Sequence, residues 1–142
     1  MQVCKYNGLV LAVLTRNEHC PPHVHVGPDD WEARFKFSFW HNSVCLWDVV
    51  PVQNRPSSTV LEDLRQLLMQ PVHLRKAREL WWQALQTMCL ENLQWDPMAS
   101  EVVSPKAGRS GALTIQTARF DAKNYQSVLQ LMGQSEPVEI EL

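Results

Sequence analysis

The fold is decided by residues 18–40, which read EHCPPHVHVGPDDWEARFKFSFW. Residues 23–26 alternate histidine with valine, and residues 31–40 alternate apolar with polar side chains. Such alternation is typical of a β-strand that has one buried and one solvent-facing side. Residues 27–30, Gly-Pro-Asp-Asp, predict a turn between these two segments. We therefore expect an antiparallel pair of strands, with His23 and His25 on one face.

Two more strands and two helices are predicted around this pair. The apolar run at residues 9–15 predicts a buried strand, and residues 44–50 predict another strand after a short turn. A capping box at Thr59 and Glu62 predicts the start of a helix. Pro71 interrupts this helix, and apolar residues at helical spacing predict a second, longer one. The expected fold class is α+β, with a small antiparallel sheet of about four N-terminal strands packed on two helices.

The last third of the chain is predicted to form a β-α-β extension behind a linker. Residues 98–111 are polar and rich in turn formers, which is typical of a linker. Strands are expected at 113–120 and 138–142. The helix between them would carry a capping residue and an apolar stripe: Asp121, Tyr125, Val128, Leu129 and Met132. The expected domains are residues 1–96 and an extension over 97–142, which is too small to fold alone and packs on the main domain or on a partner.

Composition and charge exclude several classes of protein. The 142 residues are 45% hydrophobic and 20% charged, as in a globular domain. With 13 basic and 15 acidic residues and no basic segment, a large nucleic-acid surface is not expected. The longest apolar run, residues 9–14, is far shorter than the ~20 residues that span a bilayer, and no secretory cleavage site follows it. The four cysteines lack CxxC spacing, so we expect reduced thiols and a cytoplasmic protein.

Three of the five histidines lie within residues 19–25, and this cluster carries the chemistry of the sequence. His19, His23 and His25 have a spacing that lets their rings reach one divalent transition metal ion such as zinc, with an open position for water. Alternatively, His23, His25 and Glu18 could act as general acid and base without a metal. A purely structural interpretation, in which the histidines fix a turn by hydrogen bonding, also fits the spacing.

Two further sets of residues are candidates for binding. Arg34 and Lys36 lie on the predicted solvent-facing side of the second strand, where they could bind a phosphate group. Trp81 and Trp82 occupy adjacent helix positions, which cannot both face one core. One of the two tryptophans is therefore expected to be exposed or to be buried by a partner, and the second alternative favours a homo-oligomer or a complex with a small cognate protein.

The histidine segment also carries a family resemblance. Residues 18–26, EHCPPHVHV, followed by Glu32-Ala33-Arg34-Phe35, resemble the small bacterial proteins grouped as domain of unknown function 4160. Their hallmark is an E/H-x-P-P-H-x-H-V stretch that leads into a strand hairpin and a helix containing tryptophan, to which Leu80-Trp81 is similar. The resemblance covers roughly residues 8–90 and implies a context: members of the family often look like partners in toxin–antitoxin-type gene pairs.

Two functions follow as predictions. The first is a toxin–antitoxin-associated protein that acts through protein–protein association. The alternative is a small histidine- or metal-dependent phosphodiesterase or ribonuclease built on His19, His23 and His25, because cleavage of RNA through its 2′-hydroxyl group requires only an acid and a base.

Overall fold

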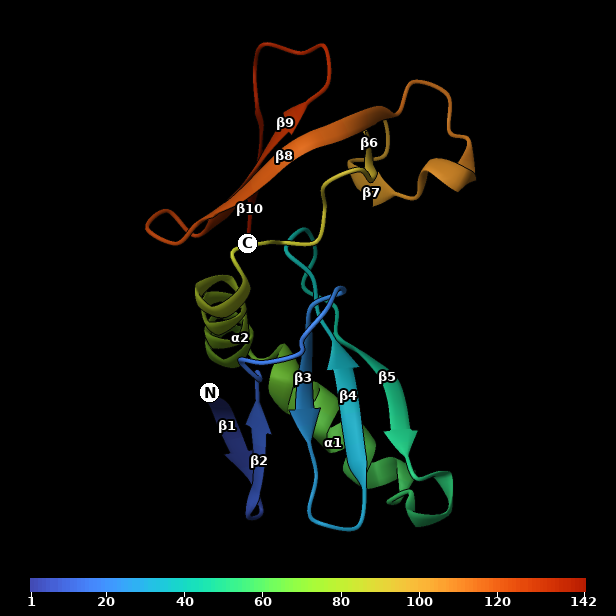
Figure 1. Ribbon diagram of the computed structural model, residues 1–142, viewed down its shortest axis with the longest axis vertical. Helices are drawn as coiled ribbons and strands as arrows, with labels where there is room; N and C mark the ends of the chain where they lie inside the picture. Colours follow the sequence, from blue (N-terminus) through green and yellow to red (C-terminus); the bar gives the residue numbers. More distant parts are fainter. The chain divides into compact units, whose positions relative to one another are not determined.

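A computed structural model describes residues 1–142, and its fold is α+β, with two helices and two antiparallel sheets of five strands each (Figure 1). The chain forms two compact units. The first unit contains residues 1–38 and 42–86, and the second contains residues 39–41 and 87–142. The division after residue 86 differs from the expected boundary after residue 96, because β6 belongs to the sheet of the second unit.

The sheet of the first unit is a simple meander in which each strand pairs with the next. It has five strands rather than about four, because residues before the apolar run also form a strand. Asn7 and Gly8 make the tight turn between the first two strands, both with positive φ (46° and 83°), as expected for an Asn-Gly hairpin. The strands are β1 (Gln2–Tyr6), β2 (Leu9–Ala12), β3 (His23–Val26), β4 (Glu32–Lys36) and β5 (Cys45–Val50).

The turn between β3 and β4 fixes the register that the site depends on. Gly27 opens this turn, and a Cβ atom at this position would lie 2.2 Å from the Trp31 carbonyl oxygen, so only glycine fits. In the resulting antiparallel register His25 pairs with Arg34, and His23 pairs with Lys36. The predicted alternation is confirmed within β4, since Ala33 and Phe35 are buried and Arg34 between them is not, but the strand ends at Lys36 rather than at residue 40.

Two consecutive helices complete the first unit: α1 (Ser58–Met69) and α2 (Pro71–Leu85), preceded by the short 3-10 helix η1 (Val52–Asn54). The predicted capping box is wrong in detail. Ser57 caps α1, because its hydroxyl accepts from the Val60 amide, and Glu62 forms an ion pair with Arg65 instead. The buried helix residues are leucines at helical spacing in α1, and Leu74, Ala77, Arg78, Leu80 and Trp81 in α2.

The second unit is all β apart from one short 3-10 helix. Its strands are β6 (Gln94–Asp96), β7 (Glu101–Val103), β8 (Leu113–Asp121), β9 (Gln126–Leu131) and β10 (Val138–Glu141), in the order β10-β9-β8-β6-β7, with η2 (Pro105–Ala107). The predicted linker thus contains β7 and η2.

The predicted C-terminal helix is wrong, because residues 121–132 belong to a hairpin. The Asp121 carboxylate does not cap a helix. It accepts hydrogen bonds from the backbone and the side chain of Asn124, which close a turn, and Tyr125 adopts a positive φ of 50°. In β9, Ser127, Val128 and Leu129 are all buried, and the Ser127 hydroxyl donates to the Phe39 carbonyl. A buried segment with apolar residues on both sides lacks the alternation that identifies a strand.

The state of the cysteines and the character of the helices bear on two further expectations. The expectation of four reduced thiols is wrong: Cys20 and Cys89 are disulfide-bonded, whereas Cys4 and Cys45 are free. Neither α1 nor α2 has the length and the apolar character that crossing a bilayer requires.

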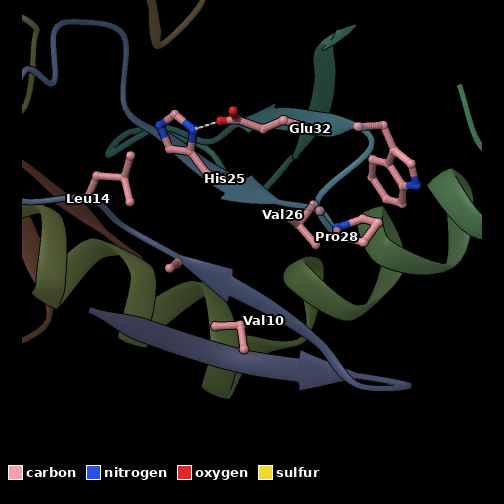
Figure 2. A pocket seen from close by; sticks show the side chains of 9 residues that line it. Val10, Leu14, His25, Val26, Pro28 and Glu32 are labelled. Carbon is pink, nitrogen blue, oxygen red and sulfur yellow. Dashed lines mark hydrogen bonds and ion pairs between the residues drawn. The ribbon is translucent and has the colours of Figure 1, made fainter. Parts of the chain in front are cut away.

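The sheet of the first unit has a pocket on the face that carries His25. Leu11 and its partner Val26 are buried, and their neighbours Ala12 and His25 pair on the opposite face. The pocket lies on that second face, beside the side chains of β2 and the end of β3 (Figure 2).

Candidate metal centre

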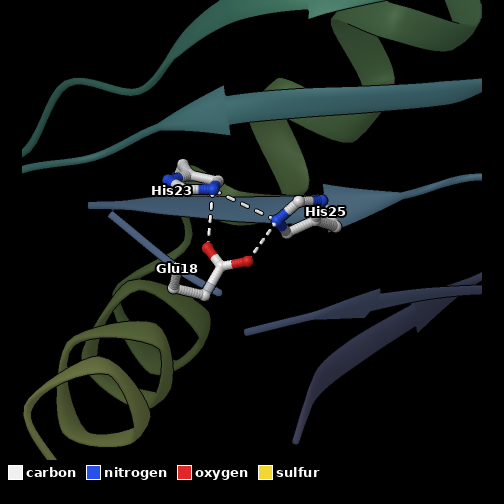
Figure 3. Close-up of side chains that lie close together, drawn as sticks. All are labelled: Glu18, His23 and His25. Carbon is white, nitrogen blue, oxygen red and sulfur yellow. Dashed lines mark hydrogen bonds and ion pairs between the residues drawn. The ribbon is translucent and has the colours of Figure 1, made fainter. Parts of the chain in front are cut away.

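Strand β3 places the His23 and His25 rings side by side, as the alternating sequence predicts. The two ring centroids are 4.8 Å apart, and the two Nε2 atoms are 3.1 Å apart. Both rings point toward Glu18, which lies in the connection between β2 and β3 (Figure 3). The structure therefore brings two of the three predicted histidines together with one carboxylate.

The His23 ring is held by the backbone of the diproline segment. Its Nδ1 atom lies 2.8 Å from the Pro21 carbonyl oxygen, which can only accept, so Nδ1 carries a proton. This leaves Nε2 facing Glu18 and His25. The side chain is only 1% exposed, and this burial lowers the pKa of the His23 imidazole, although the Pro21 carbonyl and the Glu18 carboxylate act in the opposite direction. The Nδ1 atom of His23 is thus engaged by Pro21, and Nε2 is the ring nitrogen that the side chain presents to Glu18 and His25.

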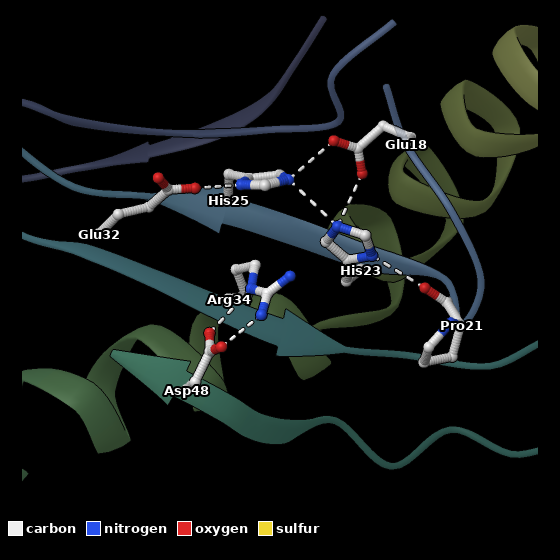
Figure 4. A network of polar contacts seen from close by, with 7 residues as sticks. All are labelled: Glu18, Pro21, His23, His25, Glu32, Arg34 and Asp48. Carbon is white, nitrogen blue, oxygen red and sulfur yellow. Dashed lines mark hydrogen bonds and ion pairs between the residues drawn. The ribbon is translucent and has the colours of Figure 1, made fainter. Parts of the chain in front are cut away.

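The His25 ring is held in the same way by a carboxylate on the neighbouring strand. Its Nδ1 atom contacts the Glu32 Oε1 atom, and its Nε2 atom lies 2.9 Å from the Glu18 Oε1 atom (Figure 4). At 16% exposure, His25 is the most accessible of the three grouped side chains. Glu32 is a residue of the site that no local sequence pattern indicates, and its place one strand across from His25 follows from the register of β3 and β4.

Glu18 is the side chain that makes this group unusual. It is only 4% exposed, and its Oε2 atom is buried without a hydrogen-bond donor, although the His23 Nε2 atom lies 2.7 Å away. The ligand atoms of Glu18, His23 and His25 all lie within 4.8 Å of one another. Three acceptor atoms that converge in a buried place repel one another unless a cation or a proton lies between them. These residues form a group that could hold a metal ion.

Arg34, predicted to bind a phosphate group, forms an ion pair with Asp48 instead. The Arg34 guanidinium binds both Asp48 carboxylate oxygens, through Nε at 2.8 Å and through Nη2, and this hydrogen-bonded pair lowers the pKa of Asp48. A bulge opposite Arg34 and Phe35 places Trp47 over the guanidinium, whose carbon atom lies 4.1 Å from the ring centroid. Lys36 makes no ion pair, and its ammonium lies 5.8 Å from the same ring.

Two other predicted residues lie outside the group. His19 is exposed, its ring is 6.2 Å from the His23 ring, and Glu18 takes the third position that the spacing assigned to it. Trp81, expected at an interface, is fully buried in the first unit, where its ring lies 5.4 Å from His23. Trp82 is half-buried. No local sequence pattern indicates the role of Trp47, because the bulge that orients its ring depends on strand pairing.

Comparisons with protein-family models, with curated proteins and with solved structures found no match. The resemblance to the family of the histidine–proline motif therefore stays a prediction.

Proposed function

We propose that this protein binds one divalent transition metal ion, with zinc as the best fit, through Glu18, His23 and His25, and that it uses the ion for hydrolysis. The observation that carries the proposal is that the ligand atoms of these three residues lie within 4.8 Å of one another, around a buried Glu18 Oε2 atom that has no hydrogen-bond partner. A single proton there would be shared by at most two of them. A metal ion would satisfy all three at once.

The hydrogen-bond partners of the two histidine Nδ1 atoms support metal binding over a role in fixing a turn. Ligating histidines nearly always donate their second N–H to a carbonyl or a carboxylate, which fixes the tautomer and the ring orientation. Both partners are present: the Pro21 carbonyl for His23 and the Glu32 carboxylate for His25. Two oriented imidazoles and one carboxylate form a donor set used by catalytic zinc sites.

The number of ligands favours catalysis over a structural role. Structural zinc sites are closed by four protein ligands, whereas catalytic sites use three and leave one position open. Here the group contains three residues. A metal ion bound there would lower the pKa of a water molecule and polarise a substrate carbonyl or phosphoryl group. Pro21 and Glu32 act as positioning residues, because each holds an imidazole ring and neither belongs to the ligand group.

The test is a zinc titration of untagged, chelator-treated protein by isothermal calorimetry. We expect one zinc ion per chain, and a loss of more than about 100-fold in affinity in His23→Ala and in His25→Ala. His19→Ala is the matched control, because it removes a neighbouring imidazole that lies outside the group. Absence of stoichiometric binding, or equal losses in all three variants, would refute the proposal.

The remaining functional expectations stay predictions. A phosphodiester or RNA substrate is one class that metal-dependent hydrolysis could serve, and its test is cleavage of bis(4-nitrophenyl) phosphate by zinc-loaded protein. Toxin–antitoxin association, with assembly into a homo-oligomer or a complex with a small cognate protein, also stays a prediction. Trp81 is already buried within the first unit, so Trp82 is the remaining tryptophan of the pair to test by mutation.

A further inference from the structure

Strands β2 and β4 carry opposite kinds of side chain on the face that holds the metal group. On β4 this face bears Arg34, which is paired with His25 in the strand register. On β2 the same face bears Ala12, which pairs with His25 from the other side. The residues two positions away on either side of Ala12, Val10 and Leu14, are each 41% exposed. An apolar surface beside a polar site indicates a place that contacts an apolar group.

These residues form the wall of a defined pocket. The pocket has a volume of about 350 Å³ and is lined by Val10, Ala12, Leu14, His25, Val26, Gly27, Pro28, Trp31 and Glu32. Figure 2 shows Val10 and Leu14 on one side and the His25 ring on the other. His25 belongs both to this pocket and to the metal group, so the two lie next to each other. The volume lies at the small end of the range for ligand sites.

The charge of the lining restricts the occupant. Glu32 is the only acidic residue in the pocket wall, and no lysine or arginine lines it. Beyond the metal centre, the groups attached to a phosphodiester would meet the Glu32 carboxylate and no lysine or arginine, so the lining adds no attraction for a charged substrate. An uncharged molecule with an apolar portion meets no such penalty, and it gains from covering Val10 and Leu14.

We propose that this pocket binds the apolar acyl group of an uncharged carboxylic ester or amide, whose carbonyl group reaches the metal centre. This inference rests on the proposed function. In the reaction, the oxygen of water bonds to the carbonyl carbon, and the bond from that carbon to the leaving oxygen or nitrogen breaks. The proton from water goes to the leaving group, so the products are a carboxylic acid and an alcohol or amine.

The test compares two metal-chelating probes of different tail length on zinc-loaded protein. Acetohydroxamate and hexanohydroxamate share one chelating group and differ by four methylenes, each of which strengthens binding about fourfold when fully buried. For a partly covered tail we expect at least about tenfold tighter binding of the longer probe by calorimetry. Val10→Ser should reduce this gain at least about threefold with zinc affinity unchanged, and Val52→Ser, an exposed valine outside the pocket, should not. Equal affinities of the two probes would overturn the inference.

A second measurement separates failure of the pocket from failure of the metal site. Hexanamide, a neutral amide, is titrated into metal-free protein and followed by methyl NMR. We expect shifts at Val10 and Leu14 and none at Val52. If zinc does not bind but these shifts occur, the pocket inference survives and the metal proposal fails. If zinc binds but hexanamide shifts no pocket methyl group, the pocket inference fails alone.

Discussion

Each unit of this protein contains one nearly buried carboxylate, and the two have opposite surroundings. Asp96 in the second unit is 9% exposed. Its Oδ1 atom accepts from the amides of Met98 and Ala99, and its Oδ2 atom accepts from Arg109. Glu18 in the first unit is 4% exposed, and it faces the Nε2 atoms of two histidines whose Nδ1 atoms contact the Pro21 carbonyl and the Glu32 carboxylate.

The comparison separates a structural carboxylate from a functional one. Asp96 closes a turn, every contact it makes is with a donor, and its charge is compensated within the fold. The Oε2 atom of Glu18 has no hydrogen-bond donor, and the side chain faces imidazole nitrogens of the proposed ligand group, so we expect a bound cation to compensate its charge. Burial and charge are alike in the two residues, and the identity of the facing atoms distinguishes them.

The largest expected effect comes from removing the Glu18 carboxylate. Glu18→Ala should weaken zinc binding by more than about 100-fold, because it removes one of three ligands. It should leave the metal-free melting temperature unchanged or raised, since it removes an uncompensated buried charge. Calorimetry with zinc and a thermal melt in chelator measure the two effects.

Asp96→Ala provides the matched comparison. It should lower the melting temperature without changing zinc affinity, because its partners are amides and a guanidinium. If the Glu18 variant were strongly destabilised without metal while its zinc affinity stayed normal, the distinction between the two carboxylates would be wrong.

A smaller effect is expected at the residue that orients His25. Glu32→Ala should weaken zinc binding by about 10- to 100-fold, the range for residues that hold a ligating histidine. Glu32→Gln should restore much of the affinity, because the amide oxygen can still accept from the His25 Nδ1 atom. Loss of affinity that Glu32→Gln does not rescue would indicate that charge, rather than orientation, is the contribution of Glu32.

The pH dependence of stability tests the structural carboxylate. Hydrogen bonds from Arg109 and from the Ala99 amide lower the pKa of Asp96. The stabilisation is therefore present above the unfolded pKa of about 4, and it is lost as the pH falls through the lower folded value. Asp96→Asn should melt below the wild-type protein at pH 7, and this difference should shrink toward pH 2. A constant difference across this range would contradict the assignment.

The smallest effect is expected at His19, the predicted ligand that the structure leaves outside the group. His19→Ala should change zinc affinity less than about twofold, because the ring is exposed and does not belong to the converging atoms. Calorimetry under the conditions used for Glu18→Ala gives the direct comparison. A loss as large as that in His23→Ala would restore His19 as a ligand.

Local patterns in the sequence were sufficient for much of the first unit. The alternation at residues 23–26 and 31–40 predicted β3 and β4, although β4 ends at Lys36, and the apolar spacing after Pro71 predicted α2. The Asn7-Gly8 pair carried a hairpin signal for β1 that our sequence analysis did not use. The helix predicted over residues 126–131 was wrong, because buried side chains on both faces of β9 resemble the apolar stripe of a helix.

Local patterns also predicted part of the site. The i, i+2 spacing within one strand was enough to place His23 and His25 together. The choice between His19 and Glu18 depended on how the connection from β2 returns to β3, which no local pattern encodes. Glu32, Asp48 and Trp47 reach the site through strand register and a bulge, and both are properties of the assembled sheet.

The most direct test of the metal centre is X-ray absorption at the zinc edge on the zinc-loaded protein. We predict one zinc ion per chain with only nitrogen and oxygen ligands at about 2.0–2.1 Å, and outer-shell scattering from two imidazole rings. Sulfur at about 2.3 Å, which Cys4 or Cys45 could supply, or protein that retains no zinc, would contradict the assignment of Glu18, His23 and His25 as the ligands.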